Sequence, residues 1–295
     1  MVHLPNKEKL VHPGWVNERI HQVDPQTCYG KSFLVIEAVT GEPIEYRLGH
    51  IPCAICLDTN AFERAPLWNI VPNNELERVL IAHGITHEKS VVLYSRVPFA
   101  AARTALVLMY AGVSDVRLLD GGIEAWRASG YQLESGSRAP APANGFGAKI
   151  PAHPEYVLNM KQVQDLLADQ NSVLACVRTW EEYIGETSGY DYIQPKGRIP
   201  GSAWAGHPMV NANGLEQKHS INLADRRCQE IAAAWQERGI TPDKRIAFYC
   251  GTGWRASLAF FYAHRMGWQD ISIYDGGWLE WSAQPDNPIE SGKPV

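Results

Sequence analysis

The chain contains the same 36-residue pattern twice. Residues 91–126 (VVLYSRVPFAAARTALVLMYAGVSDVRLLDGGIEAW) align without a gap on residues 246–281 (IAFYCGTGWRASLAFFYAHRMGWQDISIYDGGWLEW) after a shift of 155 positions. A shorter echo lies upstream, where GHIPCA at residues 49–54 matches GRIPGS at residues 197–202. A match of this length does not arise by chance, so we predict that the chain folds as two copies of one domain.

Each copy has the pattern of an α/β domain. Short apolar runs, SVVLY at residues 90–94 and RIAFY at residues 245–249, are typical of buried parallel strands. Each is followed by an apolar helix-like run that ends at a glycine, Gly112 or Gly267, and then by a second short strand. Such a strand–helix–strand unit normally forms a right-handed crossover onto a parallel sheet. We therefore predict two tandem domains, each a parallel sheet flanked by helices.

The stretch between the copies is rich in Pro, Ala and Gly, a composition typical of a linker. We place the boundary near residues 136–150, which predicts a first domain over residues 1–138 and a second over residues 150–295. A length of 295 residues suits two domains. The second copy also has a longer Gly- and Tyr-rich segment between Arg178 and Asn222, which we expect to form loops near a site.

Composition argues against several classes of partner. A net charge of −5 gives no reason to expect nucleic acid or a membrane surface, and no apolar run approaches the roughly 20 residues of a membrane span. The start, MVHLPNKEKL, has no apolar signal-peptide core, which favours the cytoplasm, or the periplasm if a leader was removed. The ten histidines show no metal-ligand spacing such as HExxH, so we assign no metal site.

The loop after the strand that ends in Cys250 is the candidate site. It lies beyond the carboxyl end of a strand and at the start of a helix, where unpaired N–H groups and the helix dipole favour negative charge. That position favours the thiolate form of a cysteine. Gly251 and Gly253 permit a tight cradle in which the amides of residues 251–255 converge on one anion, and Arg255 adds a positive charge.

The length of this loop limits what it can hold. Thiol-based phosphatases have five residues between the cysteine and the arginine, whereas four separate Cys250 from Arg255. We expect the shorter ring to be too narrow for phosphate against the thiolate and to suit a single sulfur atom bonded to Cys250. The spacing therefore favours a persulfide, and a thiol phosphatase is the least favoured interpretation.

This loop, with DGGW 25 residues later and GRIPG upstream, resembles the rhodanese (sulfurtransferase) family over nearly the whole chain. CGTGWR and TSGYDYIQPKG are especially similar to bacterial thiosulfate sulfurtransferases with several rhodanese domains. The resemblance implies an inactive first domain, an active second domain and no metal or organic cofactor. It also implies double displacement, in which Cys250 takes a sulfane sulfur from a small anionic donor such as thiosulfate and passes it to cyanide, a thiol or a protein acceptor.

The first copy lacks the parts of this site. Ser95 stands at the position of Cys250, so no persulfide can form there. Both loop glycines are absent, and Pro98 has no N–H to contribute to a cradle. We interpret this copy as a structural domain that covers one wall of the active one.

The donor is left open between two compounds. Gly251 and Thr252 stand where thiosulfate rhodaneses often have basic residues, and mercaptopyruvate sulfurtransferases use a similar Cys-Gly-x-Gly loop. We prefer thiosulfate because the whole CGTGWR loop resembles enzymes assigned to it. 3-Mercaptopyruvate is the alternative donor, and a persulfide carrier or partner-binding module without turnover is the alternative role.

Other residues near the predicted site have two interpretations each. Arg178 matches the arginine of a family strand-end motif and either binds the substrate or forms a structural salt bridge. Cys176 stands where that motif commonly has Asp, and it is either a small buried residue or a resolving thiol. Trp254 either walls the pocket or only packs. The predicted substrate- and persulfide-binding set is therefore Gly251, Thr252, Gly253, Trp254, Arg255 and Arg178.

Three further features favour structure over chemistry. Asp120 and Asp275 head a DGG turn in both copies, including the one without a thiol, so we interpret them as turn-forming. The CxxC of Cys53 and Cys56 has no second pair, which favours buried free thiols over a disulfide or redox pair and over a metal site. The pair Arg226 and Arg227 is expected to be a solvated helix start, with contact to an anionic donor as the alternative.

Overall fold

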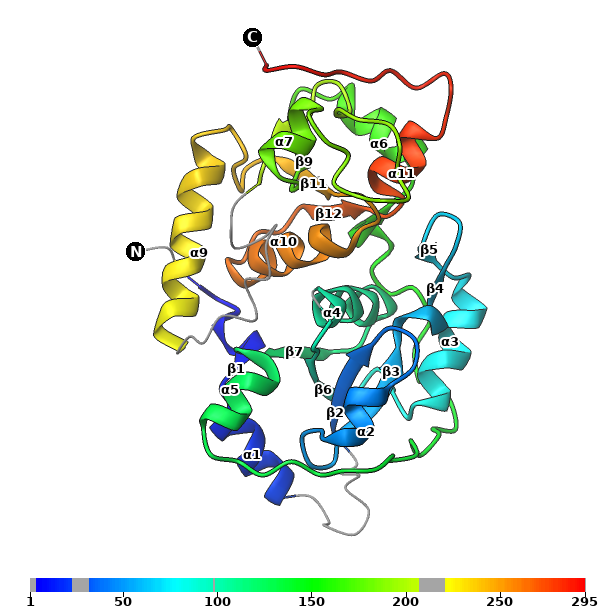
Figure 1. Ribbon diagram of the computed structural model, residues 1–295, viewed down its shortest axis with the longest axis vertical. Coiled ribbons are helices and arrows are strands. Elements are labelled where there is room, and N and C mark those ends of the chain that lie inside the picture. The colour runs from blue at the N-terminus through cyan, green and yellow to red at the C-terminus, as the bar shows by residue number, and fades with distance from the viewer. Residues whose placement is uncertain (1–3, 23–31, 98, 207–220, 295) are drawn as a thin grey trace.

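The computed structural model describes residues 4–22, 32–97, 99–206 and 221–294, with the side chains of residues 221–226 left undescribed. The chain forms two α/β units, one above the other in Figure 1. Each is built on a five-stranded sheet in which every paired strand is parallel. The predicted α/β fold class is confirmed.

The two sheets have the same strand order. The first is β1–β7–β6–β2–β3 and the second is β8–β12–β11–β9–β10. The central strands β6 and β11 coincide with the two predicted apolar runs. The strands are β1 (Leu10–Val11), β2 (Phe33–Val39), β3 (Ile55–Asp58), β6 (Ser90–Tyr94), β7 (Asp115–Leu119), β8 (Val157–Leu158), β9 (Ser172–Cys176), β10 (Ala203–Trp204), β11 (Arg245–Tyr249) and β12 (Ile271–Tyr274).

Helices surround both sheets, and short 3-10 turns lie at Lys7–Lys9, Thr59–Ala61 and Pro154–Tyr156. α4 ends at the predicted Gly112, whose φ of 107° only glycine adopts without strain. The helices are α1 (Pro13–His21), α2 (Ile44–Leu48), α3 (Asn73–Ala82), α4 (Ala100–Ala111), α5 (Gly122–Ala128), α6 (Met160–Leu167), α7 (Trp180–Ile184), α9 (Ile221–Gln236), α10 (Trp254–Arg265) and α11 (Gly277–Ser282).

The two domains share a buried interface. α4 and α10, the helices that follow the central strands, lie between the sheets and face each other (Figure 1). One continuous cluster of buried apolar side chains includes residues of both helices and of both sheets. The helix after the candidate loop is therefore buried between the domains, which explains why most of its residues are apolar or small.

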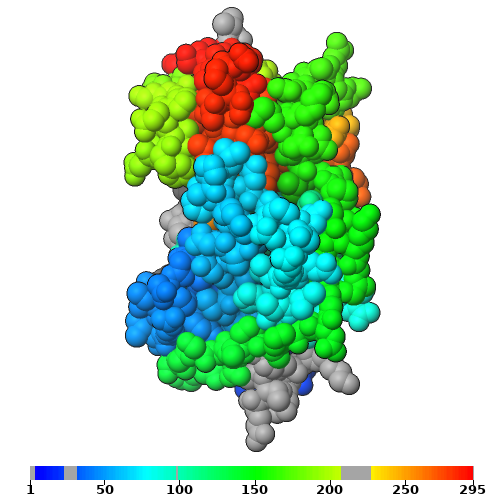
Figure 2. Space-filling model, turned by 90° about the vertical axis from the view of Figure 1, so that its right-hand side faces the viewer, coloured from blue at the N-terminus to red at the C-terminus, as the bar shows by residue number. Residues whose placement is uncertain are grey.

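A hairpin of the first domain reaches the second. Its antiparallel strands are β4 (Glu63–Arg64) and β5 (Asn69–Ile70). The amide of Ile70 donates a hydrogen bond of 2.8 Å to Oδ2 of Asp275. In Figure 2 this light-blue segment lies directly against the red C-terminal segment that contains α11.

The interpretation of Arg227 as a solvated residue is wrong. Its side chain is 3% exposed, and its Nη2 lies 2.9 Å from Oδ1 of the equally buried Asp120 in the first domain. The reason is that α9 runs along the side of both domains, so Arg227 faces the first domain rather than water (Figure 1). The side chain of Arg226 lies outside the described residues.

The cysteines are only partly as expected. Cys56, Cys176, Cys228 and Cys250 are free thiols. Cys53, however, is disulfide-bonded, so the expectation of a free thiol is wrong at this position. It lies in the turn before β3 with a φ of 66°, whereas Cys56 lies within β3, so the CxxC spans two different local structures. Cys28 lies outside the described residues.

Two observations bear on membranes and metals. In the ranges that the structure describes, no helix has the length and apolar content needed to cross a bilayer. The same ranges contain no group of three His, Cys, Asp or Glu side chains arranged to hold a metal ion. The absence of a cofactor stays a prediction.

Candidate active site

Cys250 lies in a short loop between a strand and a helix, as predicted. It directly follows β11, and α10 begins at Trp254. Gly253 is the N-cap of α10 with a φ of 84°, a left-handed conformation that glycine adopts at no steric cost. The side chain of Cys250 is only 1% exposed, so the thiol lies at the base of the loop and not on the surface.

The DGG turn holds the carbonyl side of this loop. The amide of Trp278 donates to the carbonyl of Cys250 at 2.7 Å, and that of Leu279 donates to the carbonyl of Gly251 at 3.0 Å. A Cβ on Gly277 would lie 2.7 Å from both of these carbonyl oxygens, which explains the second glycine of the motif. The turn is therefore structural, as predicted, and it acts directly on the loop.

Most backbone N–H groups of the loop have no hydrogen-bond partner. In the part of the chain that the structure describes, the N–H groups of Thr252, Gly253 and Trp254 have no hydrogen-bond partner. Such groups at a helix N-terminus form an anion-binding nest because their partial positive charges are unsatisfied. These three groups follow Cys250 in the loop, and we call them the cradle.

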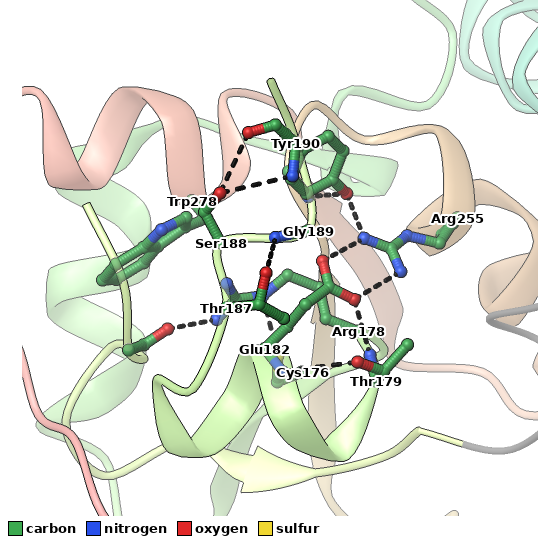
Figure 3. A network of polar contacts seen from close by, with 12 residues as sticks. Cys176, Arg178, Thr179, Glu182, Thr187, Ser188, Gly189, Tyr190, Arg255 and Trp278 are labelled. Carbon is green, nitrogen blue, oxygen red and sulfur yellow. Dashed lines mark hydrogen bonds and ion pairs between the residues drawn. The ribbon is translucent and has the colours of Figure 1, made fainter. Parts of the chain in front are cut away.

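Tyr190, which the sequence did not single out, occupies one edge of the cradle. Its hydroxyl oxygen accepts a hydrogen bond of 2.9 Å from the amide of Gly251 and another from Nη2 of Arg255 (Figure 3). Burial raises the pKa of Tyr190 well above its usual range, and a thiolate at Cys250 adds to the rise, so the phenol stays protonated. Because its oxygen accepts two bonds, its own hydrogen remains available to a bound ligand.

Arg255 is held by a buried carboxylate. Its Nη1 and Nη2 donate to the two oxygens of Glu182 at 2.8 and 2.7 Å, a bidentate pair (Figure 3). Burial raises the pKa of Glu182, but the hydrogen bonds and charge of Arg255 outweigh it and lower the pKa below its usual value. The positive charge that we expected at the loop is present, and Glu182 balances it.

Arg178 lies behind the loop. It is fully buried, donates from Nε to Sγ of Cys176 at 3.3 Å, and donates from Nη2 to the carbonyl of Gly197 at 2.6 Å. Its guanidinium lies 4.9 Å from the ring centre of Trp278, whose amide holds the carbonyl of Cys250. These contacts support the wall of the site, and direct binding of substrate by Arg178 stays a prediction, as does a resolving role for Cys176.

The remaining predicted residues line the outer edge. Thr252 is 7% exposed, whereas Tyr192 is a rim residue that is 56% exposed. Trp254 donates from its indole Nε1 to Oε1 of Glu63 in the first domain, at 2.8 Å. The loop 250–255 is therefore contacted by α7, by the Tyr-rich segment after it and by the other domain.

The equivalent loop of the first domain is arranged differently. The hydroxyl of Ser95 donates to the carbonyl of Ala38 at 2.6 Å and accepts from the amide of Val97 at 2.9 Å. Its hydrogen bonds are therefore made with backbone groups. A cavity of about 660 Å³ lies beside it, lined partly by Tyr94 and Arg96. Pro98 lies outside the described residues.

Comparison with known proteins agrees with this geometry. The family model described as rhodanese-like domain matches residues 13–129 and 159–284. A curated relative, thiosulfate sulfurtransferase YnjE of Escherichia coli, is 44% identical over 98% of this chain and 67% of its own length. The thiosulfate/3-mercaptopyruvate sulfurtransferase 1 of Arabidopsis thaliana is 28% identical over 96% of this chain and 78% of its own.

A solved structure provides a third comparison. The anaerobic ergothioneine biosynthesis enzyme of Chlorobium limicola, in complex with trimethyl histidine, is 39% identical. Its TM-score is 0.90, and the match covers all of this chain and 72% of that one.

Proposed function

Because this chain belongs to the rhodanese-like domain family, we propose that it is a thiosulfate sulfurtransferase that carries a persulfide on Cys250. The observation that supports this best is the four-residue loop, in which three unpaired amides follow a buried thiol. A cradle of this size suits one sulfur atom bonded to the cysteine.

The proposed reaction has two displacements. The thiolate of Cys250 attacks the outer sulfur of thiosulfate, a new S–S bond forms, and the bond to the sulfonate group breaks so that sulfite leaves with the electron pair. Cyanide or a thiolate then attacks the outer sulfur of the persulfide and restores the Cys250 thiolate. This covalent route predicts ping-pong kinetics.

The other residues have proposed roles in both steps. The amides of Thr252, Gly253 and Trp254 stabilise the negative outer sulfur, since buried N–H groups aimed at a developing charge act strongly in a dry site. The Tyr190 hydroxyl is placed to donate to an oxygen of the donor. Arg255, fixed by Glu182, keeps the first turn of α10 in place.

The acceptor and the donor need separate tests. The Arabidopsis relative carries both donors in its name, which keeps 3-mercaptopyruvate as the alternative. The similarity to the ergothioneine enzyme, together with the two tyrosines at the rim, adds trimethyl histidine as a candidate acceptor. A protein thiol is a further candidate, as in a persulfide carrier.

The test is intact-protein mass spectrometry after mixing with each donor. Thiosulfate should add one sulfur atom to the wild type and none to Cys250→Ser. Turnover in the presence of cyanide, a thiol or trimethyl histidine then ranks the acceptors. A stable persulfide without turnover would favour a carrier, and no sulfur gain from either donor would refute the proposal. Hydrolysis of an aryl phosphate that depends on Cys250 would instead indicate a phosphatase.

The compartment is also part of the proposal. Disulfides persist mainly in oxidising compartments, so the bonded Cys53 favours the periplasm over the cytoplasm. Fractionation of cells that express the full-length protein tests this, and recovery with the cytoplasmic fraction would reverse it.

A further inference from the structure

Glu63 of the first domain reaches the active-site loop of the second. It lies on β4 with its side chain fully buried. One carboxylate oxygen, Oε1, accepts the indole N–H of Trp254 at 2.8 Å, and the other, Oε2, accepts Nε of Arg103 at 2.8 Å. Trp254 is the first residue of α10, and its backbone amide belongs to the cradle. A carboxylate from one domain is therefore hydrogen-bonded to the loop of the other.

Arg103 extends the same network to the neighbouring residue. It lies on α4, is fully buried, and its Nη2 is 2.7 Å from Oδ1 of Asp275. A Cβ on Gly253 would lie 2.9 Å from Nη1 of Arg103, so the guanidinium rests against the backbone of the loop. Gly253 and Trp254, two successive cradle residues, are thus both contacted by side chains of one buried interdomain network.

The internal repeat supplies a matched ion pair at the other DGG turn. Asp120 is the counterpart of Asp275 in the first DGG turn, and it forms a buried interdomain pair of 2.9 Å with Arg227. Asp120 and Arg227 both lie outside the 250–255 loop, and their ion pair joins the first DGG turn to α9. If such pairs only hold the two domains together, then loss of either should have the same consequences.

We propose that Glu63 is a positioning residue for the sulfur-transfer site, acting through the indole of Trp254. A charge-assisted hydrogen bond inside a protein is strong and directional, so it fixes the start of α10 and the amides that face the outer sulfur. If these amides were displaced even slightly, the rate of sulfur transfer would fall sharply. The first domain, which has no thiol at its own loop, thereby completes the site of the second. This inference rests on the proposed function.

The experiment compares three single variants and one double variant. Trp254→Phe removes the indole N–H and keeps every charge, Glu63→Gln keeps the shape and removes the charge, and Asp120→Asn is the matched control. The assay is thiosulfate turnover with cyanide, together with thermal unfolding. We expect Trp254→Phe and Glu63→Gln each to lower kcat by about tenfold and to change KM by less than about twofold.

The combination of variants distinguishes a positioning role of Glu63 from a role that only holds the two domains together. The Glu63→Gln/Trp254→Phe double variant should lose no more kcat than the worse single variant, because both remove one interaction. Asp120→Asn should lower the unfolding temperature and leave kcat unchanged. Multiplicative losses in the double variant, or an equal loss of kcat in Asp120→Asn, would overturn the proposal. If Glu63→Gln fails to fold, then unchanged kcat in Trp254→Phe alone is enough to overturn it.

A second readout does not depend on the proposed function. The rate at which iodoacetamide alkylates Cys250, located by peptide mapping, reports the geometry of the loop whatever the substrate is. If the wild type transfers no sulfur, the proposed function fails. The positioning role then still stands if Trp254→Phe and Glu63→Gln change this rate and Asp120→Asn does not, and it falls if all three behave alike.

Discussion

Gly251→Ala should destabilise the protein because of Tyr190 and not because of backbone strain. The φ of Gly251 is not in the left-handed region, so alanine suits the backbone. A methyl group, however, would lie 2.3 Å from Cζ and 2.5 Å from Oη of Tyr190. The ring would have to retreat by about 1 Å to reach van der Waals contact. That movement breaks the two hydrogen bonds that the hydroxyl accepts.

The two lost bonds set the magnitude. A neutral hydrogen bond such as that from the Gly251 amide contributes about 0.5–1.5 kcal/mol, and one from a charged group such as Arg255 contributes about 1.5–3 kcal/mol. We therefore expect Gly251→Ala to lower the free energy of unfolding by about 2–4.5 kcal/mol, measured by urea denaturation. Gly145→Ala is the matched control, because a Cβ there meets no atom within 4 Å.

The decisive measurement uses a background without the ring. In Tyr190→Ala both bonds are already lost and the space is open, so adding Gly251→Ala should cost less than about 0.5 kcal/mol more. If Gly251→Ala is as costly in that background as in the wild type, the ring is not the reason for the glycine. The same contact explains why this loop has no basic side chain after its cysteine, since Tyr190 occupies the space that such a side chain needs.

Two further predictions concern buried charge. Glu182→Gln leaves Arg255 without its charge partner and should lower the free energy of unfolding at neutral pH by about 2–4 kcal/mol, less than for a fully buried pair because Arg255 is 11% exposed. Because folding lowers the pKa of Glu182, its contribution to stability is present above its ordinary pKa of 4.5 and is lost as the pH falls below that value. Urea titrations of Glu182→Gln should therefore show no such loss of stability at low pH. Burial lowers the pKa of His264 from 6.5 to about 4, so stability should fall by up to about 3 kcal/mol as pH drops through that window. An equal fall in His264→Gln would contradict this assignment.

The sequence predicted the fold because the same pattern occurs twice. Two gapless copies with strand-like and helix-like runs in the same order require the same topology, and the two sheets indeed share one strand order. The position of Cys250 between β11 and α10 followed from local pattern alone. Tyr190 and Glu182 did not, because their partners in the loop lie 61 and 73 residues further along the chain. They come from a segment without periodicity, where spacing carries no information about contact.

The error at Arg227 came from the interface between the copies. Arg227 has the local pattern of an exposed helix start, and only the packing of α9 on both domains buries it against Asp120. A polar side chain that would be exposed on one isolated domain becomes buried when the two domains pack together. No property of a single helix shows which of its polar side chains will be buried in this way.

The repeat nevertheless contains a signal that becomes interpretable once the packing is known. Arg103 on α4 aligns with Leu258 on α10, and each is directed at the loop of the other domain. Arg103 lies against Gly253 in the loop that has a thiol, whereas Leu258 lines the cavity beside Ser95 in the loop that has none. The charged member of the pair therefore faces only the loop with chemistry to support, together with Glu63. A buried ionic network is costly to desolvate and adds little to stability by itself. The network lies at the loop that has the thiol, whereas at the other loop the apolar Leu258 takes the position of Arg103. This placement is what we expect if the network fixes the geometry of the cradle.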